Sequence, residues 1–133
     1  MKEDKRIYVV LPAVVEVAGK QWVAQPPGRQ IAQACHVSAK LRHERGLTTH
    51  KAPLMGRQPV YEDITTIILA ARDSHEMMHV FQLLEKRKLF STFFSDQNPE
   101  AYGSDFRPIT ALATLARPAQ VEGILDYLPL WGS

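Results

Sequence analysis

Polar side chains that could bind an anion recur at helical spacing early in the chain. The intervals between them are four, three, four and three residues, and they are Arg29, Gln33, His36, Lys40 and His43. Because successive residues of a helix are about 100° apart, this spacing places all of them on one narrow line. We therefore predict a helix over residues 28–45 that exposes a mostly basic line.

The opposite side of this predicted helix is small or apolar and consists of Ile31, Ala34, Cys35, Ser38 and Leu41. We expect these residues to pack against a sheet. Cys35 then belongs to the core, because neighbours in a helix point about 100° apart and it cannot form a thiol pair with His36. Pro26, Pro27 and Gly28 precede the helix, and the free N–H groups of its first turn suit a phosphate.

Positive charge is concentrated in one third of the chain. The net charge of the whole sequence is only +2. Between residues 29 and 57, however, a single acid, Glu44, stands against six basic residues, which are Arg29, Lys40, Arg42, Arg45, Lys51 and Arg57. Residues 47–62 also contain prolines and glycine, so we predict a basic surface loop there. Such asymmetry favours an anionic partner.

Length and composition bound the fold and the compartment. A chain of 133 residues that is 45% hydrophobic fits one globular domain over residues 1–133. The single cysteine excludes an internal disulfide, and no Cys/His group has the spacing of a structural zinc site, so we expect a reducing, cytoplasmic location. No apolar run approaches the ~20 residues of a membrane-spanning helix, so we expect no membrane partner.

Hydrophobic patterns predict strands that alternate with helices. Continuous apolar runs typical of buried strands occupy residues 6–11, 64–71 and 109–116, and shorter candidates occupy 14–17, 21–24 and 90–94. A second helix is predicted from a cap at Asp73 to about Lys88, and a short one over residues 119–127. We expect an α/β three-layer sandwich, in which helices cover both faces of a small mixed sheet of about four strands.

This order of elements resembles the type II peptidyl-tRNA hydrolase family over nearly the whole chain. The family carries a G-K-x-x-A-Q-x-x-H-A helix after its first strand, and the matching positions are Gly28, Ala32, Gln33 and His36. Asp96 stands where the family's D-A-G-x-T loop begins. Thr110, with Gly103 and Ser104, matches the residues that open its last strand.

The resemblance implies hydrolysis of the ester that joins a peptide to the 3′ ribose of tRNA, with no metal or cofactor. Such an ester needs an oriented water, a group that takes its proton and positive charge for the oxyanion. By this resemblance Asp96 orients or deprotonates water, and Arg29 binds phosphate or supports the oxyanion. Thr110 supplies a hydrogen bond, and His36 orients these groups or contacts RNA. We assign further tRNA contacts to Gln33, Lys40, His43, Lys51 and Arg57; homodimerisation is left open.

Two departures from the family keep a second interpretation open. Arg29 replaces the usual lysine; arginine keeps the charge but does not release a proton at neutral pH. The loop after Asp96 reads D-Q-N-P-E, so Glu100 replaces the loop threonine. The alternative is an RNA-binding module of the same fold without catalysis.

A third interpretation comes from residues 75–79, whose sequence His-Glu-Met-Met-His matches the H-E-x-x-H pattern of zinc peptidases. In that pattern two histidines one helical turn apart bind zinc, and the glutamate acts as general base. Here both histidines lie on the polar side of the predicted second helix, and Glu100 is the only obvious third ligand by spacing. We rank a zinc peptidase below the other two functions.

Overall fold

The computed structural model of the protein describes residues 4–17, 21–49, 60–61, 64–96, 102 and 107–132. Its centre is a four-stranded sheet with strand order β6-β1-β8-β7. The strands are β1 (Arg6–Pro12), β6 (Thr66–Ala71), β7 (Ser91–Ser95) and β8 (Ile109–Ala116). β1 pairs parallel with β6 and antiparallel with β8, and β7 is antiparallel to β8, so the sheet is mixed as predicted.

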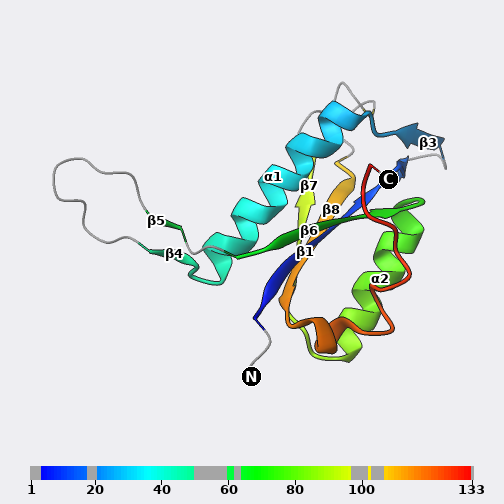
Figure 1. The fold of residues 1–133 in the computed structure, drawn as a ribbon. Coiled ribbons are helices and arrows are strands. Elements are labelled where there is room, and N and C mark those ends of the chain that lie inside the picture. The colour runs from blue at the N-terminus through cyan, green and yellow to red at the C-terminus, as the bar shows by residue number, and fades with distance from the viewer. Residues whose placement is uncertain are drawn as a thin grey trace, which may run out of the picture.

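Helices cover both faces of this sheet, which confirms the predicted α/β sandwich (Figure 1). α1 (Pro27–Glu44) buries Val37 and Leu41 against Ile7 and Val9 of β1. α2 (Ser74–Lys86) buries one stripe on the other face, in a second core cluster. Within the described ranges, neither helix is long and apolar enough to cross a membrane.

The ends of both helices follow the predicted signals. The Asp73 carboxylate accepts a hydrogen bond of 2.8 Å from the backbone N–H of Glu76, and the Glu76 side chain accepts one of 2.9 Å from the N–H of Arg72. These bonds satisfy free donors of the first turn. α1 is followed by Gly46, whose φ of +64° is the left-handed conformation expected of a helix stop.

The buried side of α1 differs from the prediction. It consists of Gln30, Gln33, Ala34, Val37 and Leu41. Ile31 is 51% exposed and Cys35 is exposed, so the prediction that these two residues pack in the core was wrong. The cause is that buried glutamines find partners: Gln30 donates 3.1 Å to the Pro12 carbonyl and accepts 3.0 Å from the Trp131 indole. Satisfied amides of this kind can be buried at little cost.

Two small ladders flank the central sheet. The predicted short strands at 14–17 and 21–24 are present as β2 (Val14–Val17) and β3 (Gln21–Ala24), which pair antiparallel close to the N-terminus of α1 (Figure 1). Within the stretch predicted as a loop, β4 (Thr48–Thr49) pairs with β5 (Val60–Tyr61). Residues 50–59 between them lie outside the described part of the chain.

The C-terminal region is less helical than predicted. Instead of a helix over residues 119–127 it forms a short 3₁₀ helix, η1 (Pro118–Val121), followed by turns. Gly123 has a φ of +80°, outside the helical range, and the residues around it form turns. Ile124, Leu125 and Leu128 are nevertheless buried in the core beside α2, so the amphipathic pattern predicted burial correctly and the type of element wrongly.

Candidate active site

A buried carboxylate lies beside the N-terminal half of α1. Asp96 directly follows β7, is 8% exposed, and donates its backbone N–H to the Pro108 carbonyl at 3.0 Å. Its Oδ2 accepts hydrogen bonds of 2.8 Å from Gln33 Nε2 and 2.8 Å from the Tyr102 hydroxyl. One carboxylate oxygen is therefore held by an amide of α1 and by a phenol from another part of the chain.

Tyr102 is a site residue that the sequence did not predict. Its side chain is buried against Val15 and Val17 of β2. Its hydroxyl lies 3.0 Å from Gln25 Oε1 in addition to its contact with Asp96. A phenol has one hydroxyl hydrogen, so it can donate to only one of these two oxygens at a time. The only signal for Tyr102 was an isolated aromatic residue in a polar loop.

The environment of Tyr102 keeps its phenol protonated. Burial raises the pKa of Tyr102 above its usual value, and the hydrogen bond to Asp96 raises it further, because a neighbouring carboxylate disfavours a phenolate. The hydrogen bond with Gln25 and the charge of Arg29 act in the opposite direction and lower this pKa by smaller amounts. Tyr102 is thus a neutral hydrogen-bond donor near pH 7.

Arg29 reaches the same cluster through the ring of Tyr102. Its guanidinium carbon lies 5.6 Å from the ring centroid, within the range of a cation–π contact. Arg29 stands in the first turn of α1, which contains no acidic residue, and the N-cap Pro26 gives no side-chain hydrogen bond. The positive end of the helix dipole and the arginine charge therefore lie close together.

We predicted that Gln33 lies on the exposed line of α1. This prediction was wrong, because Gln33 is only 4% exposed. Its Nε2 bonds to Asp96, and its Oε1 has no hydrogen-bond partner among the described residues. The same is true of Gln25 Nε2. The cluster therefore contains one buried acceptor and one buried donor that the described protein groups leave unpaired, which is uncommon in folded proteins.

The remaining predicted residues of α1 follow the neighbouring strand β7. The His36 imidazole stacks on Phe94, with ring centroids 4.8 Å apart and planes at 18°. Lys40 Nζ donates a 2.6 Å hydrogen bond to the Phe93 carbonyl, and His43 is exposed. An exposed strip of α1 thus continues from the Asp96 cluster along β7.

Thr110 lies on β8 and is 2% exposed. Its hydroxyl donates to the Phe94 carbonyl at 3.4 Å, so in this structure it faces the backbone of β7. Lys51, Arg57 and Glu100 lie outside the described residues, so their predicted roles stay predictions.

The H-E-x-x-H residues have other contacts in this structure. His75 Nε2 lies 3.1 Å from Glu16 Oε2, and its ring meets Trp22 edge-on at 5.0 Å. The Glu76 carboxylate is occupied by the N–H of Arg72 and by an ion pair of 3.2 Å with the Arg72 side chain. No three His, Cys, Asp or Glu side chains in the described ranges are grouped so that they could hold a metal ion.

Fold and site together define an α/β protein with a buried, doubly hydrogen-bonded carboxylate beside a basic helix. No family model and no curated protein sequence matches the chain. Among solved structures, it is similar to a protein of unknown function from Agrobacterium tumefaciens strain C58. The TM-score is 0.61 over 97% of this chain and 98% of that chain, at 12% sequence identity. At this identity the similarity shows the fold alone.

Proposed function

We propose that the protein hydrolyses the ester bond of peptidyl-tRNA and releases the peptide and free tRNA. The observation that carries the proposal is the 2.8 Å hydrogen bond between Gln33 and Asp96. These two residues belong to the helix and the loop on which the resemblance to type II peptidyl-tRNA hydrolases rests. The bond supports the proposal because an active site of that family would need α1 and the segment after β7 to lie side by side.

In this proposal Asp96 orients the attacking water and takes its proton, while Gln33 and Tyr102 fix the carboxylate. Arg29 stays charged at neutral pH, and with the N-terminus of α1 it stabilises the oxyanion or binds the neighbouring phosphate. Thr110 contributes a hydrogen bond from the adjacent strand once substrate is bound. No step requires a metal or a cofactor.

The proposed tRNA surface begins at this cluster and follows α1. His36 and Phe94 form an aromatic pair at which a base can stack, and Lys40 adds positive charge one turn further along. His43, Lys51 and Arg57 extend the surface in the proposal, whereas the buried Gln33 acts by positioning Asp96. We place the reaction in the cytoplasm, where peptidyl-tRNA arises.

The second candidate function is a tRNA-binding module without catalysis. It is favoured by the burial of Asp96, which is 8% exposed and already accepts two hydrogen bonds. Both bonds fall on Oδ2, so activation of water at this oxygen would require its contacts to rearrange. The arginine at position 29 is also a weaker partner in proton transfer than a lysine.

Turnover separates the two candidates. Peptidyl-tRNA is incubated with the parent protein, with Asp96→Asn and with Arg29→Lys, and the release of free tRNA is followed. Hydrolysis is expected for the parent and is lost in Asp96→Asn, which still binds tRNA; Asp4→Asn, at an exposed position, is the matched control. Binding without hydrolysis by any variant would establish the second candidate. Activity gained only with Arg29→Lys would indicate an active site that has decayed, and full activity of Asp96→Asn would contradict the mechanism.

A further inference from the structure

β6 lies at the edge of the central sheet, and its outward-facing backbone groups can be identified from its pairing. The Thr65 carbonyl accepts from the Ile7 N–H at 2.9 Å, so the odd-numbered residues of this segment bond towards β1. The even-numbered residues Thr66, Ile68 and Ala70 therefore direct their N–H and C=O groups away from the sheet, because these groups alternate along a strand.

The C-terminal segment covers only part of this edge. The Ala70 N–H donates to the Pro129 carbonyl at 2.8 Å, and the Trp131 N–H donates to the Ile68 carbonyl at 2.9 Å, in antiparallel geometry. Gly132 follows with a φ of +85°. Trp131 therefore lies opposite Ile68, and further towards the start of β6 both backbone groups of Thr66 have no backbone partner among the described residues. Unpaired edge groups of this kind are a template for a further extended chain.

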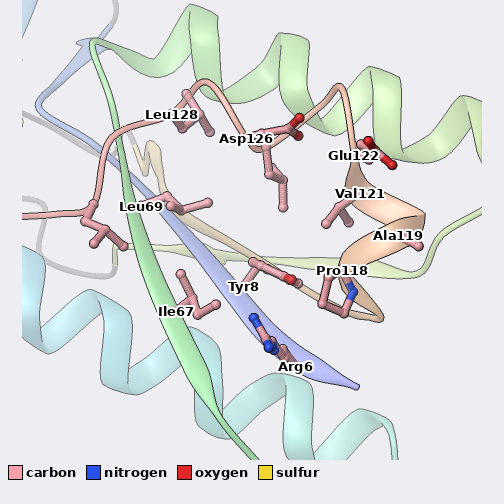
Figure 2. Close-up of a pocket in the computed structure, with 12 residues that line it drawn as sticks. Arg6, Tyr8, Ile67, Leu69, Pro118, Ala119, Val121, Glu122, Asp126 and Leu128 are labelled. Atoms are coloured by element: carbon pink, nitrogen blue, oxygen red, sulfur yellow. The ribbon is translucent and has the colours of Figure 1, made fainter. Parts of the chain in front are cut away.

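An apolar cavity of about 430 Å³ lies on one side of this open edge (Figure 2). Tyr8, Ile67 and Leu69 form its sheet side, and the C-terminal turns contribute its other wall. Leu130, on its rim, is 60% exposed. The cavity can therefore accept an apolar side chain from a segment that pairs with β6.

A second cavity of about 410 Å³ lies on the opposite face of the same strand, between β6 and α1. Its helix side is lined by the small side chains of Ala34, Cys35, Ser38 and Ala39. Its strand side is lined by Thr66 and Ile68. Successive side chains of a strand point to opposite faces. A chain paired with β6 would thus place its side chains alternately in the two cavities.

Arginines lie near the start of β6 on both faces. Arg6 lines the first cavity, and Arg42 lines the second. The acids of the first cavity, Glu122 and Asp126, lie across it from Arg6 (Figure 2). A chain that runs antiparallel to β6, as residues 129–131 do, brings its C-terminal end to these arginines. Charge complementarity favours a carboxylate at that end.

We propose that the open part of the β6 edge binds an extended apolar peptide segment of a partner protein. The segment runs antiparallel to β6, hydrogen-bonds to Thr66, fills the two cavities alternately and ends in a carboxylate beside Arg6. This binding site is separate from the Asp96 cluster and does not depend on the function proposed for it.

Amide hydrogen exchange with a defined peptide tests the proposal. The probe is an N-acetylated six-residue peptide that alternates threonine and leucine and has a free C-terminal carboxylate. Saturating peptide is expected to slow exchange at the Thr66 N–H and to leave Ala70, which is already hydrogen-bonded, unchanged. A C-terminally amidated peptide, or the free-acid peptide with Arg6→Gln, should bind more weakly by up to about fivefold; Lys5→Gln is the matched control.

A peptide N-methylated at alternate amides, which cannot complete the ladder, should not bind. Equal binding of the methylated peptide, or no protection of the Thr66 amide at saturation, would overturn the proposal. It would also be overturned if this amide were protected without peptide and the protection increased with protein concentration, because the edge would then pair with a second copy of the chain.

Discussion

Gln33 Nε2 donates a 2.8 Å hydrogen bond to Asp96 Oδ2, although the two residues are 63 positions apart in the chain. Each is less than a tenth exposed, so water does not compete strongly for either group. The bond fixes the rotation of α1 about its axis relative to the end of β7. It thereby determines which side chains of the helix are exposed and where the carboxylate lies.

Replacing Gln33 with leucine should therefore destabilise the fold. The substitution keeps the approximate volume but leaves the buried Asp96 carboxylate without one donor, a loss of about 1–3 kcal/mol in the free energy of unfolding. Urea denaturation measures it. Gln82→Leu, the same change at an exposed position of α2, should stay within about 0.5 kcal/mol of the parent. Equal effects of the two substitutions would show that the bond contributes nothing specific.

The raised pKa of Tyr102 should make stability fall at alkaline pH. The folded chain retains the phenol proton at a pH where the unfolded chain, with the ordinary value of 10.0, loses it. This contribution is complete below pH 10 and decreases as the pH rises through the folded-state pKa. The free energy of unfolding should thus decline less steeply in Tyr102→Phe than in the parent.

Asp96→Asn should lower the pKa of Tyr102, because the charge of Asp96 and its hydrogen bond both raise it. Phenolate absorbance across an alkaline titration reports the change, with the Tyr102→Phe spectrum subtracted to remove the other tyrosines. A pKa of Tyr102 that is the same in the parent and Asp96→Asn would mean that the two groups do not interact in solution.

Trp131→Phe should cost more stability than Trp22→Phe. The Trp131 indole N–H donates to Gln30 Oε1 at 3.0 Å, and its loss leaves that amide oxygen without this donor, at a cost of about 1–2 kcal/mol. Trp22 is 45% exposed and should tolerate the same change. Thermal unfolding of both variants provides the comparison, and a reversed order would contradict the assigned role of the indole.

Lys40→Gln should weaken tRNA binding and reduce its dependence on salt. Loss of one phosphate contact lowers the slope of log K against log[salt] by about 0.7–0.9. Lys86→Gln provides the control, since Lys86 is exposed on α2 on the opposite face of the sheet. Binding measured at several salt concentrations distinguishes the variants. Equal slopes for both would place the RNA surface elsewhere.

The continuous apolar runs predicted the central strands correctly, because a strand that is buried on both faces is apolar at successive positions. The prediction of which side of α1 is buried was wrong at Ile31 and Cys35, because an interpretation based on hydrophobic periodicity places glutamines on the exposed side. Here both amide groups of Gln30 bond to partners distant in sequence, and the Nε2 of Gln33 bonds to Asp96. The prediction of a C-terminal helix was wrong around Gly123, because the hydrophobic pattern carries no information about a positive φ.

The motif resemblance predicted Asp96 and Arg29, and the structure connects both through Tyr102. Tyr102 and Gln25 were not predicted, because neither belongs to a periodic pattern or to the family motif. Their contribution depends on β2 and on the chain after β7 meeting in space, which no local spacing encodes.

The central position of β1 also constrains the order of events during synthesis. β1 is synthesised before its neighbours β6 and β8, which begin about 60 and 100 residues later in the chain. Until β8 has been made, one side of this apolar strand has no partner. We therefore expect the central sheet to be completed only after β8 has been synthesised, and β1 to depend until then on protection from aggregation.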